Sequence, residues 1–247
     1  MIFHVITIFP DYFSSPLKYG VIAKAISSGK LEVNLVDLRQ FTTDKHRTTD
    51  DRPYGGGAGM VMIPGPLSKA IESVKKEKTD LEVILLSPAG RLFNHKLAQE
   101  LAKKKELVLI CGRYEGVDQR IIDGYVDMEL SIGDYVLTGG EPAAIVVIDA
   151  IGRLLPSVLG CDQSAKNDSF ATGLLEHPQY TRPRTFMDMD VPQVLLEGNH
   201  KEIEKWRRRK SLELTAKRRP DLLKKAKLSA KDIEYLKGIG SKKDEKE

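Results

Sequence analysis

The sequence lacks the residue patterns of disulfide-bonded and zinc-binding proteins. Only two cysteines occur, Cys111 and Cys161, and they show no C-x-x-C spacing. The five histidines are scattered along the chain, without an H-E-x-x-H pair or a Cys/His cluster. We therefore predict neither a disulfide framework nor a metal site built from side chains.

The common motifs of nucleotide binding and hydrolysis are also missing. There is no G-x-x-x-x-G-K-[ST] segment, and no G-x-G-x-x-G segment opens a helix after the first apolar run. A G-x-S-x-G elbow is absent as well. These absences argue against a P-loop enzyme, an ordinary Rossmann-type dehydrogenase or methyltransferase, and an α/β-hydrolase.

Long apolar runs are missing too. No stretch of the sequence approaches the roughly 20 apolar residues that span a membrane. The first residues, MIFHVITIFPDYF, are apolar, but they lack the basic start and the cleavage site of a signal peptide. We therefore expect a first strand there, and a cytoplasmic protein without a membrane partner.

What the sequence does contain is enough apolar material for a core and one strongly basic segment. The chain has 247 residues, 41% of them hydrophobic, which suits one large domain or two smaller ones. Residues 201–231 hold thirteen Lys and Arg against four Asp and Glu, although the whole chain carries only +4. The rest is therefore mildly acidic, and the basic segment indicates a polyanionic partner. Charge alone fits a solvated helical face equally well.

Strand-like and helix-like patterns alternate over the first 155 or so residues. We predict strands over 2–9, 31–38, 83–86, 107–111 and 126–130, and helices over 17–27, 66–76, 95–104, 117–123 and 141–155. This alternation predicts an α/β fold with a mostly parallel sheet flanked by helices.

The pattern changes after a polar run at 163–169. Asn199 and Glu202 have the spacing of a capping box, which predicts a helix through about Lys217 that Pro220 stops. A short helix is predicted over 229–236, followed by a frayed tail from Gly240. We expect an α/β domain at 1–159, a linker at 160–175 and a small helical domain at 176–247.

Three glycine-bearing segments follow predicted strands, at 87–90, 112–116 and 132–140. Ligands of open parallel sheets bind beyond the carboxyl ends of the strands, so a small-molecule site is predicted there. The segment SIGDYVLTGGE at 131–141 stands out, because glycines let a ligand approach the backbone. Taken alone, a tight strand–helix connection explains this segment better than a ligand does.

The same segment closely resembles the cofactor loop of the bacterial tRNA (guanine-N1)-methyltransferases, the TrmD family of the SPOUT superfamily. Further matching motifs, in the same order, are IFP at 8–10, RPYGGGAGM at 52–60, LSP at 86–88, CGRYEGVD at 111–118, DSF at 168–170, HPQYTRP at 177–183, VP at 191–192 and WR at 206–207. The resemblance covers nearly the whole chain, and its specificity lies in the ordered set. One departure is EPA at 141–143, where family members often have Glu-Leu-Pro; proline is acceptable in a first helical turn.

The resemblance implies a deep trefoil knot near the C-terminal end of the α/β domain, and an obligate homodimer with its active site between subunits. It also implies that the knotted loops bind S-adenosylmethionine. The implied cofactor contacts are Leu86, Ser87, Pro88, Gly112, Arg113, Tyr114, Glu115, Ile132, Gly133, Asp134, Tyr135, Val136, Leu137, Gly139 and Gly140. The family has been linked to Mg²⁺, with Glu115 as an indirect contributor; a simple surface carboxylate is the alternative.

The implied reaction is methylation of N1 of guanosine 37 in tRNA, a base preceded by another guanosine. Asp168 matches the family's general base, and Arg153 matches the residue that holds O6 and stabilises its negative charge. Without the resemblance, Asp168 would be a polar linker residue and Arg153 a solvated helix end at a favourable dipole position.

Residues expected to contact RNA lie in two regions of the chain. They are Lys45, His46, Arg47, Asp50 and Arg52 before the glycine run, and Arg182, Arg207 and Arg208 near the C-terminus. A long flexible surface loop is the alternative for the first region. Two other functions stay open: a SPOUT-type methyltransferase acting on another RNA nucleotide, and a non-catalytic RNA-binding protein on the same scaffold.

Overall fold

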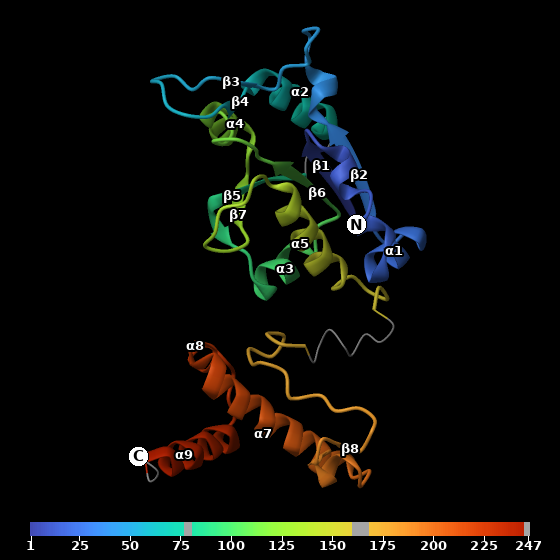
Figure 1. The fold of residues 1–247 in the computed structure, drawn as a ribbon, viewed down its shortest axis with the longest axis vertical. Helices are drawn as coiled ribbons and strands as arrows, with labels where there is room; N and C mark the ends of the chain where they lie inside the picture. The colour runs from blue at the N-terminus through green and yellow to red at the C-terminus, as the bar shows by residue number, and fades with distance from the viewer. Residues whose placement is uncertain (77–80, 160–167, 245–247) are drawn as a thin grey trace. The chain divides into compact units, whose positions relative to one another are not determined.

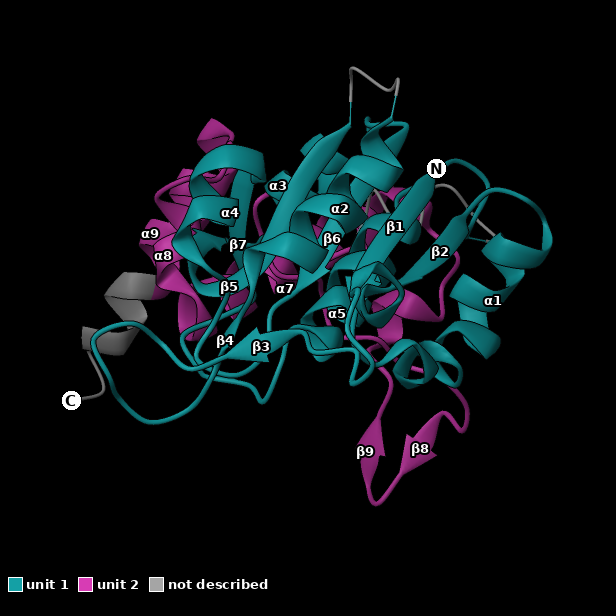
Figure 2. Ribbon diagram, turned by 90° about the horizontal axis from the view of Figure 1, so that it is seen from above, with its two compact units in different colours: residues 1–160 teal, residues 161–247 magenta. Residues whose placement is uncertain are grey.

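A computed structural model describes residues 1–76, 81–159 and 168–244. The chain divides into two compact units, residues 1–160 and 161–247, which Figure 2 colours separately. No helix in the described part of the chain is long and apolar enough to cross a membrane.

Unit 1 is built on a parallel five-stranded sheet of order β2-β1-β6-β5-β7, seen in Figure 1. Its strands are β1 (Ile2–Thr7), β2 (Glu32–Asp37), β5 (Glu82–Leu92), β6 (Glu106–Cys111) and β7 (Met128–Ser131). The short strands β3 (Asp50–Asp51) and β4 (Val61–Met62) form a separate antiparallel pair. The predicted α/β fold with a mostly parallel sheet is thus confirmed.

Helices cover both faces of this sheet. They are α1 (Gly20–Ser27), α2 (Pro64–Lys75), α3 (His95–Leu101), α4 (Gln119–Tyr125) and α5 (Glu141–Gly152), with 3-10 helices η1 (Pro10–Phe13), η2 (Pro16–Lys18) and η3 (Leu38–Phe41). Side chains of β6 alternate between two apolar clusters, with Leu107 and Leu109 on the side of α1, α3 and α5, and Val108 and Ile110 on the side of α2 and α4. Burial on both faces explains why the strands are continuous apolar runs.

Strand β5 extends further than the predicted 83–86. Its ladder with β7 is interrupted after Leu86 and resumes at Arg91, so that Leu86 and Arg91 both pair with Leu130. Pro88 and Gly90 predict a turn, and residues 87–90 are indeed not paired with β7. Pairing resumes because Gly90 has no side chain: a Cβ would lie 2.3 Å from the backbone nitrogen of Leu130.

Unit 2 contains a hairpin, one 3-10 helix and three α-helices among its described residues. They are β8 (Thr185–Phe186), β9 (Met189–Asp190), η4 (Gln193–Leu195), α7 (His200–Arg218), α8 (Pro220–Leu223) and α9 (Ala230–Asp244). Asn199 caps α7 as predicted, since its side chain accepts a hydrogen bond from the Glu202 N–H.

The helix predicted through about Lys217 and stopped by Pro220 is confirmed, because α7 ends at Arg218. Pro220 also begins α8, since the N–H that proline lacks is not used by the first residue of a helix. One expectation for unit 2 was wrong. Helix α9 continues to Asp244, through the first part of the tail that was expected to be frayed.

The predicted linker at 160–175 falls partly outside the described residues, which resume at Asp168. From there the chain packs within unit 2: Leu174 is buried, and the Leu175 N–H donates to the Thr215 hydroxyl on α7 at 2.9 Å. The domain boundaries themselves stay a prediction.

We predict that Gly90→Ala destabilises unit 1 by about 3 kcal/mol, because the added Cβ would overlap the backbone of β7. Chemical denaturation measures this change. The matched control is Gly65→Ala in α2, where an added Cβ meets nothing within 4 Å and should cause no loss. Equal stability of the two variants would contradict the close packing of β5 on β7.

Candidate functional site

A cavity of about 490 Å³ opens at the carboxyl ends of β6 and β7, beside the point where the ladder of β5 is interrupted after Leu86. The three glycine-bearing segments predicted from the sequence converge on it, although at least 15 residues separate each from the next along the chain. This is the edge of a parallel sheet at which ligands bind.

Nearly all of the residues predicted to hold a cofactor line this cavity. They are Leu86, Ser87, Pro88, Gly112, Arg113, Tyr114, Glu115, Ile132, Gly133, Tyr135, Val136, Leu137, Gly139 and Gly140. Asp134 belongs to the same loop but is not one of the lining residues. The structure therefore brings this predicted set together, apart from Asp134.

Glycine is required where the last loop meets the end of β6. The Gly140 N–H donates to the Gly112 carbonyl at 2.9 Å, and Arg113 forms an antiparallel bridge with Gly139. A Cβ on Gly140 would lie 2.7 Å from the Cα of Cys111, closer than a side chain can pack. Without side chains at 139 and 140, two loops lie together and border one cavity.

The guanidinium of Arg113 is held inside the protein. Its Nε donates to the Glu141 carboxylate at 2.9 Å, and one Nη donates to the Thr138 carbonyl at 3.1 Å. The Glu141 side chain is fully buried. Arg113 therefore lines the cavity while its charge is already paired.

The predicted RNA-contacting loop reaches the rim of the cavity. Tyr114 lines the cavity and hydrogen-bonds to Asp50; burial, followed by the negative charge of Asp50, raises the pKa of the Tyr114 hydroxyl. Glu115 packs against Gly59: a Cβ added to Gly59 would lie 2.3 Å from a carboxylate oxygen of Glu115. Asp50 and Gly59 thus contact side chains that line the cavity.

Lys45, His46 and Arg47 lie at the exposed tip of that loop. Asp44 closes the tip into a turn, because its carboxylate accepts hydrogen bonds from the Thr48 N–H at 3.0 Å and the Thr48 hydroxyl at 2.8 Å. Hydrogen bonds from Thr48 lower the pKa of Asp44. Three cationic or titratable side chains are thereby directed to solvent, together with exposed Arg52 nearby.

A second, smaller hollow of about 260 Å³ lies in unit 2. Its lining includes Asp168, Glu176 and His177 from the segment before the hairpin, and Arg207 and Arg208 from α7. Asp168, the predicted base, therefore lies beside two of the predicted RNA-contacting arginines. Arg182 is exposed elsewhere in unit 2, and Arg153 is in unit 1, at the C-terminal end of α5.

Comparison with known proteins identifies the family. The family model described as tRNA (Guanine-1)-methyltransferase TrmD matches residues 1–225. The chain belongs to the TrmD family of tRNA (guanine-1)-methyltransferases.

Relatives across bacteria agree with this assignment. The chain is 56% identical to a tRNA (guanine-N(1)-)-methyltransferase of Geotalea uraniireducens, over 96% of each chain. It is 54% identical to the protein of that name from Dictyoglomus turgidum, over 95% of each chain. A third, from Sulfurihydrogenibium, is 55% identical over 96% of this chain and 92% of its own.

Some residues of this TrmD family member acquire a role only in the folded chain. Sequence reasoning did not single out Glu141 as the partner of Arg113, nor Thr7, whose hydroxyl donates to Glu141 at 2.8 Å. Their only signal is that both lie in or next to motifs of the family pattern. Trp206 similarly packs between His177 and Tyr180, with ring centroids 6.3 and 6.1 Å away.

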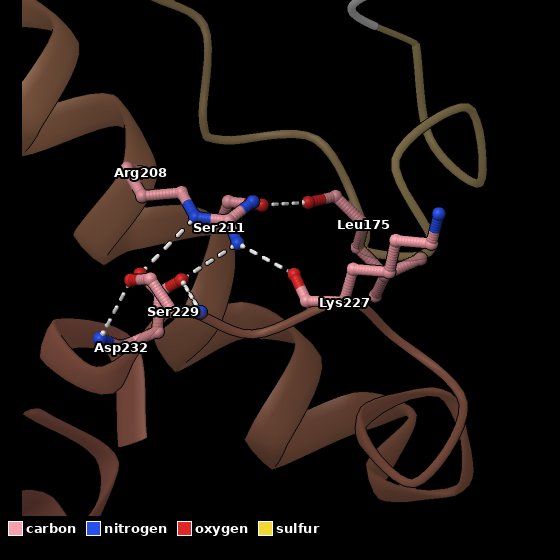
Figure 3. Close-up of polar contacts among 6 residues, drawn as sticks. All are labelled: Leu175, Arg208, Ser211, Lys227, Ser229 and Asp232. Carbon is pink, nitrogen blue, oxygen red and sulfur yellow. Dashed lines mark hydrogen bonds and ion pairs between the residues drawn. The ribbon is translucent and has the colours of Figure 1, made fainter. Parts of the chain in front are cut away.

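Arg208 of the methyltransferase was predicted to contact RNA, but it is paired within unit 2. Its guanidinium forms a two-pronged bridge to Asp232 on α9, at 2.9 and 3.2 Å (Figure 3). Figure 3 also shows Ser229 beside the same carboxylate, and the Ser211 hydroxyl donating to the Leu175 carbonyl. The hydrogen bond from Arg208 lowers the pKa of Asp232 to about 2.

Within the described residues, no group of three or more His, Cys, Asp or Glu is placed to hold an ion. Glu115 stands beside the backbone of Gly59 as a single carboxylate.

Asp232→Asn should lower the free energy of unfolding of unit 2 by up to about 2 kcal/mol near neutral pH. Because folding depresses the pKa of Asp232, its stabilisation is present above the unfolded value of 3.8 and disappears as the pH falls through about 2. The difference in the free energy of unfolding between wild type and Asp232→Asn should therefore disappear as the pH falls from 4 to 2. Urea unfolding followed by Trp206, the one tryptophan of the chain, measures it.

The matched control is Asp221→Asn, which breaks a bridge to Arg219 at 2.7 Å between two well-exposed side chains. Exposed ion pairs contribute little to stability, so the free energy of unfolding of Asp221→Asn should be close to that of wild type. A loss of stability as large as that of Asp232→Asn, or a gap that persists at pH 2, would contradict the assignment.

Proposed function

We propose that the chain transfers a methyl group from S-adenosylmethionine to N1 of guanosine 37 in tRNA, at a guanosine preceded by another guanosine. One observation carries the proposal: three glycine-bearing loops converge on a single cavity in a chain that belongs to the tRNA (guanine-1)-methyltransferase family.

The cavity suits the methyl donor. S-adenosylmethionine supplies an electrophilic methyl group on a sulfonium sulfur. Apolar side chains such as Leu86, Ile132 and Leu137 line the cavity together with the backbone of Gly139 and Gly140. The apolar side chains would pack on an adenosine, and the backbone N–H and C=O groups would hydrogen-bond to it. Positioning and proximity of the two substrates supply much of the rate of such a transfer.

The protein's part in the reaction is to move one proton and to balance one charge. Guanine N1 carries a proton, so a base must accept it as the methyl is attacked, and negative charge then builds on O6. Asp168 is the proposed base, supported by its place in a hollow that also has arginines. Arg153 is the proposed O6 partner, supported by its match to the family pattern.

No step is assigned to Mg²⁺. The described residues include no ligand cluster, and Glu115 alone does not fit a protein-built site for an ion that needs near-octahedral oxygen coordination. An indirect role of Glu115 in a magnesium requirement stays a prediction.

Three further features belong to the proposal. The first is the trefoil knot of the SPOUT fold, supported by the close contact between loops 112–116 and 132–140. The second is a homodimer with the active site between subunits. The third is a cytoplasmic location, where tRNA is modified. The last two are supported by family membership.

The basic helix α7 is the proposed tRNA contact of unit 2. Arg207 is exposed and lines the hollow of Asp168, whereas the neighbouring Arg208 is engaged with Asp232. Phosphate contacts of this kind position a nucleic acid without reading its sequence. The target guanine must leave the base stack of the tRNA to reach Asp168, the proposed proton acceptor.

Asp168→Ala should abolish methyl transfer while S-adenosylmethionine still binds with wild-type affinity, because Asp168 does not line the cofactor cavity. Calorimetry measures binding, and mass spectrometry of nucleosides from the treated tRNA identifies the product. Full turnover by this variant would remove Asp168 from the mechanism.

The same product analysis with wild-type enzyme separates the alternatives. A methylated ribose or another methylated base would favour a different SPOUT-type activity. Absence of cofactor binding by wild type would favour a non-catalytic RNA-binding protein.

Arg207→Ala should weaken tRNA binding at all sequences and reduce the slope of log affinity against log salt by about 1, as expected when one phosphate contact is lost. Anisotropy of labelled tRNA at several salt concentrations measures both. Lys96→Ala is the control, because Lys96 is an exposed cation on α3 in unit 1, outside the predicted RNA contacts. An unchanged slope for Arg207→Ala would exclude it from the interface.

A further inference from the structure

A buried carboxylate lies directly behind the cofactor cavity. The Glu141 side chain, at the first position of α5, is fully buried, and Arg113 contacts one of its two oxygens at 2.9 Å. The Arg113 guanidinium also lies 4.6 Å from the ring centre of Phe9. A buried charge is tolerated only when it is paired and hydrogen-bonded, so these contacts are necessary to Glu141.

Thr7 supplies the other half of this arrangement. Its hydroxyl donates to the second Glu141 oxygen at 2.8 Å and accepts the Phe9 N–H at 2.9 Å. The single hydroxyl proton of Thr7 is thereby directed at Glu141. Thr7, at the end of β1, is itself fully buried.

The network joins three parts of the chain that are distant in sequence. Thr7 ends β1, Arg113 follows β6, and Glu141 begins α5. Arg113 also holds the Thr138 carbonyl at 3.1 Å, and Thr138 lies in the loop that lines the cavity. The described residues that line the cavity include Arg113 and Thr138, but neither Thr7 nor Glu141.

We propose that Thr7 and Glu141 are positioning residues for the methyl donor. They fix the Arg113 guanidinium, and Arg113 in turn holds the loop at 133–140 at the distance from the end of β6 that forms the cofactor cavity. Their effect on the cofactor is therefore transmitted through Arg113. The inference rests on the proposed function, which supplies the identity of the ligand.

Packing around Gly139 supports transmission through Arg113. A Cβ at Gly139 would lie 2.1 Å from the Arg113 Nε, so the side chain of Arg113 and the backbone of the loop are in direct contact. A shift of the guanidinium would have to move the Thr138–Gly139 segment with it. Loss of the hydrogen bond from Thr7 to the buried Glu141 carboxylate favours such a shift, because an unsatisfied buried carboxylate oxygen is costly unless another donor moves to it.

The decisive variant is Thr7→Val, which keeps the shape of the side chain and removes the hydroxyl, and with it the hydrogen bond to Glu141 and the one from the Phe9 N–H. We expect the dissociation constant for S-adenosylmethionine to rise about tenfold, in the range for loss of one hydrogen bond to a charged group. The KM for the cofactor should rise more than kcat falls, and tRNA affinity should stay within twofold of wild type. Thr7→Ser retains the hydroxyl and should restore cofactor binding.

A matched control separates positioning from general loss of stability. Ile71→Val removes one methylene from a fully buried side chain of α2, in the apolar cluster on the other face of the sheet. It should lower the melting temperature without changing cofactor affinity. Glu141→Gln, which keeps the size but removes the charge facing Arg113, should weaken cofactor binding at least as much as Thr7→Val and gives a second measure if that variant folds poorly.

Three outcomes would overturn the inference: wild-type cofactor affinity in folded Thr7→Val and Glu141→Gln, equal weakening in Ile71→Val, or failure of Thr7→Ser to restore binding. Failure of the proposed function looks different, because wild-type protein would then not bind S-adenosylmethionine in the same calorimeter.

Discussion

The contact between the backbone at Gly140 and the end of β6 is the constraint on which the site of unit 1 depends. The Gly140 N–H bonds to Gly112, and no side chain at position 140 would fit beside Cys111. This contact brings the loop after β7 against the loop after β6 and sets where α5 begins. It therefore places Glu141, the first residue of α5, in the interior, where its charge must be met by Arg113 and Thr7.

A glycine-rich loop alone would be too mobile to keep a cavity of fixed shape. Glycine permits the close approach but contributes no side-chain contacts, and it has the largest conformational freedom to lose. The ion pair behind the loop offsets that freedom, since Arg113 bonds both Glu141 and the Thr138 carbonyl. The glycine backbone at 139–140 lets a ligand approach, and the buried pair of Arg113 and Glu141 holds that backbone in place.

Much of unit 1 could be predicted because its strands are buried on both faces. Runs such as LVLIC at 107–111 predict a parallel strand from hydrophobicity alone, and the glycine segments after them predict the ligand edge. The second part of β5 could not be predicted, because Pro88 and Gly90 signal a turn while the resumed pairing depends on β7. Thr7 and Glu141 were missed for a similar reason: their partners lie more than 100 and nearly 30 residues away.

The neighbouring residues Arg207 and Arg208 show why charge on a helix does not by itself identify an interface. Successive residues of an α-helix point about 100° apart, so two adjacent arginines face different surroundings. Arg208 points at α9, where Asp232 and the Lys227 carbonyl meet it, whereas Arg207 stays exposed beside the hollow of Asp168. A run of cations in the sequence predicts a polyanion partner for the helix as a whole. Only the packing of α9 on α7 determines which of those cations remain available to bind it.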